Sequence, residues 1–207
     1  MESTSIRGPR PSTRISEVRK RDLINAAIAS ISDVGYNDVT VQAICNAAGF
    51  SRGLIGHYFK GKDALLFEAV KAVAAELGGS TRKAASAAGA DPLGRLHAVV
   101  HASFNPPGFT EENVSVWVSL AGNARWSEEL ASLYRELWRG YRKAIERLME
   151  SAARACQVDI DAATAALTYT QLIEGLWIGW AADPDEVTRE RAEAACHCYL
   201  DTLFGKL

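Results

Sequence analysis

The chain has 207 residues, of which 23 are Lys or Arg and 25 are Asp or Glu, and its net charge is −2. This balance excludes a uniformly basic nucleic-acid binder, and the length is enough for one sizeable core or for a small and a larger domain. The charge is unevenly distributed, because residues 1–62 carry nine basic and five acidic residues whereas the remainder carries 14 and 20. A basic head on an acidic body favours a DNA-contacting end joined to a domain with another role.

The cysteine content and the apolar runs indicate the compartment. The four cysteines do not form the dense pattern of a disulfide framework. No signal peptide is recognisable, and charged residues interrupt the long apolar runs. We therefore expect a cytoplasmic protein with reduced thiols, no membrane-spanning helix and no cofactor.

The N-terminal segment predicts an arm followed by a helix. Residues 1–15 are rich in Ser, Thr, Arg and Pro, a composition typical of a disordered basic arm. Residues 16–34 place Ile and Ala side chains at helical spacing, and Gly35 is expected to end this first helix.

Two short helices joined by a tight turn are predicted next. Apolar residues recur at i, i+3, i+4 and i+7 between Val41 and Ala48, and Gly49 suits the left-handed conformation that often ends a helix. Ser51 is expected to cap the following helix. Its buried side is predicted to be Leu54, Ile55, Tyr58 and Phe59, and its exposed side Arg52, Gly53, Gly56 and His57.

The rest of the chain predicts six more helices and no strand. The helix after Gly61 keeps its apolar spacing to Leu77, where Gly78-Gly79 is expected to weaken it. Further helix starts are predicted at Asp91-Pro92, at Thr110, at Ser127, at Asp159 or Asp161, and at Asp183-Pro184-Asp185. The chain is thus predicted to be all-α, with nine helices in a head at residues 16–62 and a body at residues 63–207.

The two short helices have the pattern of a DNA-binding helix-turn-helix. A helix that exposes small residues and a cation can lie close to the DNA backbone and place side chains in the major groove. The Gly53-Leu-Ile-Gly56 spacing also imitates the loop of an RNA-binding KH module, but that module requires flanking strands, which the sequence does not predict.

These residues resemble the TetR family of transcriptional repressors, and most closely its choline-responsive BetI branch. The resemblance is carried by Thr40, which opens the first of the two short helices, together with the Ala47-Ala48-Gly49 turn, Ser51, His57-Tyr58-Phe59 and Lys62. It continues more weakly around Trp117 and around residues 173–177. The resemblance implies a nine-helix regulator in which two heads bind a palindromic DNA operator and a small-molecule inducer releases them.

The resemblance also implies roles for individual residues. Thr40, His57 and Lys62 are expected to contact phosphates, whereas Arg52 and Gly53 are expected to face the groove, with Arg52 suited to a bidentate guanine contact. The full set of expected DNA-binding residues is Thr40, Ser51, Arg52, Gly53, Gly56, His57, Tyr58, Lys60 and Lys62. The last two long helices are expected to form the homodimer, and the helix after Gly61 to transmit ligand binding to the heads.

Aromatic residues are concentrated in the second half of the chain. All five tryptophans lie beyond residue 110, and Glu174 precedes Trp177 by three residues on one predicted helix. Rings together with a carboxylate can hold a quaternary ammonium ion by cation–π attraction. The expected ligand-binding residues are Trp117, Trp126, Tyr134, Trp138, Glu174 and Trp177. The alternative is that these rings pack the core or the dimer interface.

Other chemistries have weaker support. Cys196 and Cys198 point about 200° apart on a helix and cannot converge on one metal ion. His97 and His101 have metal-ligand spacing without an evident further ligand, so no metal site is expected. No catalytic motif is recognisable, and an enzyme is not expected. Two alternatives stay open: the same regulator with an apolar drug-like or metabolite inducer, and a helical enzyme or binding protein that does not bind DNA.

Overall fold

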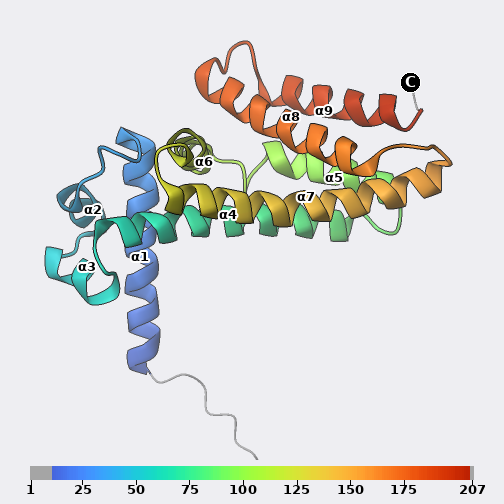
Figure 1. The fold of residues 1–207 in the computed structure, drawn as a ribbon. Helices are drawn as coiled ribbons and strands as arrows, with labels where there is room; N and C mark the ends of the chain where they lie inside the picture. The colour runs from blue at the N-terminus through green and yellow to red at the C-terminus, as the bar shows by residue number, and fades with distance from the viewer. Residues whose placement is uncertain (1–10, 206–207) are drawn as a thin grey trace, which may run out of the picture. The chain divides into compact units, whose positions relative to one another are not determined.

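A computed structural model describes residues 11–205, with side chains from residue 15 onward. Nine α-helices and no strand occur in this range (Figure 1). The all-α prediction is therefore confirmed for the described part of the chain. The chain divides into two compact units, a head up to Ala69 and a body from Val70 onward.

The head contains α1 (Pro11–Val34), α2 (Val41–Ala48), α3 (Arg52–Tyr58) and the first turns of α4 (Lys62–Ala87). Helix α1 begins at Pro11, where a proline suits the first helical position, and not at Ser16 as predicted. The last residues of the predicted arm at 1–15 are thus helical, and residues 1–10 lie outside the described range.

Local signals set the ends of α2 as predicted. The Thr40 hydroxyl accepts a hydrogen bond from the Ala43 backbone N–H at 3.1 Å, which satisfies one of the donors left unpaired at a helix start. Gly49 has φ +69°, the left-handed conformation that glycine adopts without strain. Ser51 occupies the cap position of α3, but its side chain accepts no capping hydrogen bond, so that part of the prediction is wrong.

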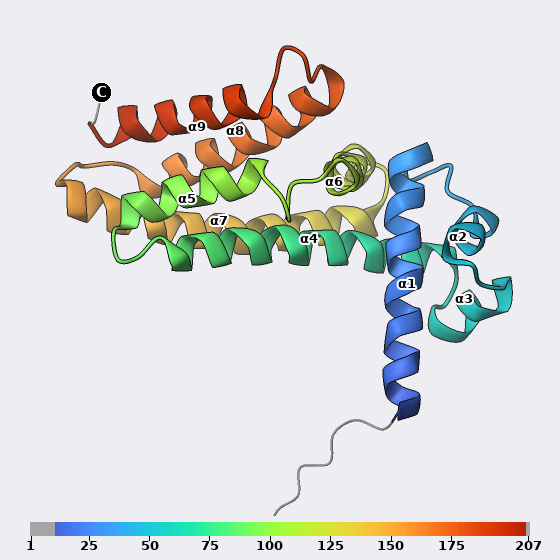
Figure 2. The same cartoon turned by 180° about the vertical axis from the view of Figure 1, so that it is seen from behind.

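The body contains the rest of α4 together with α5 (Pro92–Phe104), α6 (Glu111–Ala124), α7 (Glu128–Cys156), α8 (Ala162–Ala182) and α9 (Arg189–Leu203). The side chains of Asp91, Thr110, Ser127 and Asp161 cap α5 to α8. Helix α7 packs against α5, α6 and α8, and α9 packs against α5 and α8 (Figures 1 and 2).

Two predicted boundaries in the body are wrong. Helix α4 continues through Gly78-Gly79 to Ala87, where the alanine-rich final turns favour a helix and the Arg82 side chain folds over Gly78. Helix α9 begins after Thr188, because Asp183 caps only a single turn. The next residues fold back onto α8, where a Cβ on Gly179 would lie 3.1 Å from Val187 Cγ2.

Between residues 11 and 205, no helix combines the length and apolar character needed to cross a membrane.

Candidate DNA-binding face and ligand cavity

Helix α3 buries one side and exposes the other. Ile55 and Phe59 are buried, and the Lys20 ammonium lies 5.7 Å from the Phe59 ring centroid. Arg52, Gly53, Gly56 and His57 are exposed, as the apolar spacing predicted, and so is Ser51. Leu54 and Tyr58, which were predicted to be buried, are only half-buried. A Cβ on Gly53 or on Gly56 would meet no atom within 4 Å, so the space beside these residues is open. Because glycine has no side chain, another molecule can approach the α3 backbone closely here.

Arg52 is tied to α2 through a glutamine that sequence reasoning missed. Arg52 Nε donates to Gln42 Oε1 at 2.7 Å, and Gln42 Nε2 donates to Asn46 Oδ1 at 2.6 Å. All three side chains are exposed. The one available signal was that Gln42 and Asn46 share a face of α2 at i and i+4 spacing.

The remaining predicted DNA-binding residues surround this face. Lys62 Nζ donates to the Val39 backbone carbonyl at 3.0 Å, which fastens the start of α4 next to the α2 cap. His57 and Tyr58 make an edge-to-face contact with ring centroids 4.8 Å apart. Thr40 and Lys60 are exposed and Tyr58 is half-buried. The head thus collects every predicted DNA-binding residue on or beside α2 and α3.

Four of the predicted ligand-binding rings form one cluster in the body. The centroid of Trp117 on α6 lies 6.1 Å from Tyr134, 5.7 Å from Trp138 and 6.2 Å from Trp177. Trp117, Trp138 and Trp177 are each 6–7% exposed. Trp177 Nε1 donates to the Ser103 backbone carbonyl on α5 at 2.9 Å, so this ring lies inside the body.

Glu174 lies beside this cluster as a buried carboxylate. The Tyr134 hydroxyl donates to its two oxygens, each at 2.8 Å, and Gln171 Nε2 donates to Oε2 at 2.8 Å. Glu174 is 7% exposed, and no cationic side chain of the described residues lies within ion-pair distance. Burial, and then the hydrogen bond to Glu174 and its negative charge, raise the pKa of Tyr134, so that its hydroxyl remains a proton donor.

Trp126 does not join the cluster. It lies between α6 and the Ser127 cap of α7, is 80% exposed, and has the Arg125 guanidinium carbon 5.5 Å from its ring centroid. Trp126 therefore lies outside both the cluster and the cavity lining, because a residue in a turn need not follow the inward direction of the neighbouring helices.

A cavity of about 540 Å³ opens against the aromatic cluster within the body. Trp117, Trp138 and Trp177 form part of its lining, and neither Tyr134 nor Glu174 does. Most of the remaining lining is apolar and comes from α4, α5, α7 and α8, including Leu77, Val99, Ile145, Leu148 and Ile173. The volume lies within the range typical of small-molecule sites.

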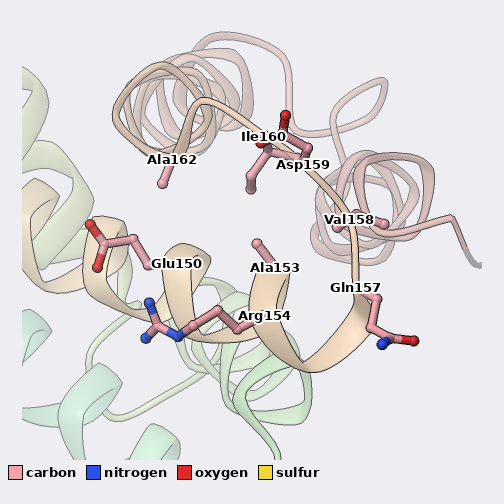
Figure 3. Close-up of a pocket in the computed structure, with 8 residues that line it drawn as sticks. All are labelled: Glu150, Ala153, Arg154, Gln157, Val158, Asp159, Ile160 and Ala162. Carbon is pink, nitrogen blue, oxygen red and sulfur yellow. The ribbon is translucent and has the colours of Figure 1, made fainter.

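A second hollow lies at the turn between α7 and α8 (Figure 3). Its lining includes Glu150, Arg154, Gln157 and Asp159 and contains no aromatic side chain. It is wide open to solvent, so it offers little burial to a ligand, and the cavity beside the tryptophans is the better candidate.

The histidines and cysteines form no recognised metal centre in residues 11–205. His97 Nδ1 lies 2.7 Å from His197 Nδ1, which connects α5 to α9. Cys196 is buried and Cys198 is exposed, so the two thiols do not converge. Burial, and to a lesser extent Glu193, raise the pKa of the Cys196 thiol to about 12, which keeps it protonated and unreactive.

Comparison with known proteins identifies the family. The profile of bacterial regulatory proteins of the tetR family matches residues 23–69, and the profile of the C-terminal domain of BetI-type transcriptional repressors matches residues 92–205. The chain belongs to the TetR family. Its resemblance to the BetI branch is thereby confirmed, and the protein is a transcriptional regulator with a BetI-type body.

Individual relatives and solved structures match along nearly the whole chain. The regulator BetI 1 of Chromohalobacter salexigens is 27% identical over 200 residues, which cover 95% of each chain. The solved structure of a transcriptional regulator from Pseudomonas aeruginosa PAO1 has 29% identity, a TM-score of 0.81 and 91% coverage of both chains. A regulator from Saccharomonospora viridis, solved in complex with choline, has 23% identity and a TM-score of 0.79, covering 90% of this chain and 96% of its own.

Proposed function

We propose that the protein is a homodimeric repressor that a small cationic ligand releases from a palindromic DNA operator. The observation that carries the ligand assignment is Glu174, a buried carboxylate without a cationic partner among the described residues, next to four aromatic rings. A buried charge is costly unless it is paired, so this site gains from a positively charged ligand.

The DNA face is proposed from the exposed side of α3 and its surroundings. Arg52 and Gly53 approach the base edges, whereas Thr40, His57, Lys60 and Lys62 contact phosphates. Ser51, Gly56 and Tyr58 complete the surface. One head offers few contacts, so specific binding needs two heads on two half-sites, about one helical turn of DNA or a multiple of it apart.

The dimer is proposed to form through α8 and α9. Leu167 and Ile178 on α8 are 45% and 46% exposed, whereas Thr170 and Ile173 on the other side of the helix are buried. The exposed side of α8 carries no charged residue between Thr164 and Ile178. On α9 the exposed residues from Ala194 onward are small and uncharged, namely Ala194, Ala195, Cys198 and Thr202, whereas the exposed Glu190 and Arg191 confine the charge to its first turn. Two such faces can pack closely as a four-helix bundle.

The ligand is proposed to be a quaternary ammonium compound such as choline. Each ring face contributes about 0.5–2 kcal/mol of cation–π attraction, and a quaternary ion loses little hydration on entering an apolar site. The rings now contact one another, so the cation enters from the cavity, where Trp117, Trp138 and Trp177 are part of the lining. The buried indole N–H of Trp117 has no hydrogen-bond partner among the described residues and is available to a ligand oxygen. The choline complex of the Saccharomonospora relative supports the same ligand class.

Release from DNA is proposed to be a population shift transmitted by α4. This helix carries Lys62 in the head, and in the body it carries Leu77 and Thr81 in the cavity lining. The ligand is proposed to bind more tightly to a conformation in which α4 is displaced. In that conformation the spacing of the two heads no longer matches successive major grooves, so ligand binding lowers DNA affinity.

A second candidate is the same repressor with an uncharged apolar inducer. The mainly apolar lining of the cavity favours it, as does the absence of Glu174 from that lining, although Arg82, Glu136 and Arg147 also contribute to the lining. Thermal shift assays with choline, betaine aldehyde and a panel of hydrophobic compounds distinguish the two candidates. A cationic site predicts that only choline and betaine aldehyde raise the melting temperature, whereas an apolar site predicts that the hydrophobic compounds do. Gel shift with DNA from upstream of the protein's own gene tests the shared DNA-binding function.

A further inference from the structure

Gln42 holds the side chain of Arg52 in one orientation. The Arg52 Nε–H points to Gln42 Oε1 at 2.7 Å, within normal hydrogen-bond length. A guanidinium is planar, so fixing Nε also fixes the direction of the two terminal nitrogens. Those nitrogens carry four N–H donors and stay available for an acceptor in the DNA groove.

The donor-only guanidinium of Arg52 determines which end of the Gln42 amide faces it, because a reversed amide would turn its NH₂ group toward another donor. The NH₂ group of Gln42 is therefore left to donate to Asn46 Oδ1 at 2.6 Å, one helical turn further along α2. The three side chains therefore make an ordered chain from α2 to the first residue of α3.

We propose that Gln42 is a positioning residue for base recognition by Arg52, and that it does not itself contact a base. This proposal rests on the DNA-binding role assigned to Arg52 above. Glutamine reads adenine by using its carbonyl oxygen and its NH₂ group together. Each of these groups already has a protein partner, Arg52 for the oxygen and Asn46 for the NH₂ group, so α2 and α3 set the orientation of the amide before any base is present.

The physical effect is on the entropy of binding. An unrestrained arginine must lose several rotamers when it docks on a guanine, at a cost that is appreciable for each immobilised side chain. The bond to Gln42 removes part of this cost before binding. Since the three residues are exposed, the same bonds contribute little to folding stability.

The test is a double-mutant cycle on a selected operator. Wild-type protein is first used to enrich binding sites from a random DNA duplex library, and every base pair of the selected site is then substituted. Affinity at fixed salt is measured for wild type, Gln42→Met, Arg52→Ala and the double variant. Methionine keeps the size of glutamine and removes its hydrogen bonds. Gln157→Met, at the C-terminal end of α7, is the matched control.

Gln42→Met is expected to lose discrimination at the same base pair as Arg52→Ala, by about 5- to 50-fold for the dimer, with an unchanged melting temperature. In the Arg52→Ala background it should cause no further loss. Gln42→Glu retains an acceptor for Arg52, so it should keep the discrimination while weakening binding to every sequence by charge repulsion.

Three results would overturn the proposal in different ways. If the losses of Gln42→Met and Arg52→Ala add, or fall on different base pairs, Gln42 contacts DNA directly and is not a positioning residue. If Arg52→Ala discriminates as well as wild type, Arg52 is not the base-reading residue and Gln42 has nothing to position. If wild-type protein enriches no sequence, the DNA-binding function itself fails.

Discussion

Replacing Glu174 by glutamine should separate a cationic ligand site from an apolar one. Glutamine keeps an oxygen that can accept from Tyr134 and removes the negative charge. If the cation displaces the rings enough to reach about 5 Å from the carboxylate, the attraction is about 3 kcal/mol at an effective dielectric constant of about 20. Part of this gain is lost to desolvation, so about 1–2 kcal/mol should remain, a roughly 5- to 30-fold loss of choline affinity in the variant.

The assay is calorimetric titration of wild type and Glu174→Gln with choline and with 3,3-dimethyl-1-butanol, in which carbon replaces the charged nitrogen. The uncharged compound should bind weakly and equally to both proteins. Without ligand, the variant should be as stable as wild type or more so, because it no longer buries an unpaired charge. Equal choline affinity in the two proteins would show that Glu174 does not stabilise the ligand's charge, and equal affinity of wild type for the two compounds would show that the site does not select a cation.

Four further perturbations test other parts of the account. Arg52→Ala should lower operator affinity by about 1–3 kcal/mol per subunit in a gel shift assay while the protein stays folded and dimeric; unchanged affinity at fixed salt would contradict the base contact. Deletion of residues 1–10, which carry Arg7 and Arg10, should reduce the slope of log affinity against log salt by about 0.9 per lost phosphate contact, and a full-length slope would exclude the arm from binding. Trp177→Phe removes the buried bond to Ser103 and should cost about 1 kcal/mol in denaturant unfolding and weaken the ligand response; a monomer in size-exclusion chromatography would instead make Trp177 an interface residue. Leu167→Asp should give a monomer of nearly wild-type helicity by circular dichroism, and an intact dimer would place the interface elsewhere.

The start of a helix could be predicted from the sequence where a capping side chain determines it. Thr40, Asp91, Thr110 and Ser127 cap the helices that they were expected to cap, because a side-chain oxygen two or three residues before an unpaired N–H acts within one turn. The same signal gave the wrong start for α9 at Asp183. That side chain caps only a single turn, and the packing of Val187 against Gly179 moves the start of α9 to the residue after Thr188.

Part of each candidate site could also be predicted from local sequence patterns. The exposed side of α3 followed from apolar spacing alone. The aromatic cluster followed from composition, but Trp126 did not belong to it, since the direction of a turn side chain depends on tertiary packing. The partner roles of Gln42 and Gln171 could not be read from the sequence. The i, i+4 spacing of Gln42 and Asn46 shows only that the two can pair, and nothing local distinguishes a glutamine that orients a charged side chain from one that faces solvent.

Release of the head from DNA by a cation bound in the body can be measured by fluorescence anisotropy. A labelled duplex from upstream of the protein's own gene is titrated with the protein in the absence and presence of saturating choline. We expect tight, salt-sensitive binding that choline weakens, together with a matching loss of choline affinity when operator is present, because the coupling between two sites is reciprocal. Binding to the duplex that saturating choline leaves unchanged would contradict release by this ligand.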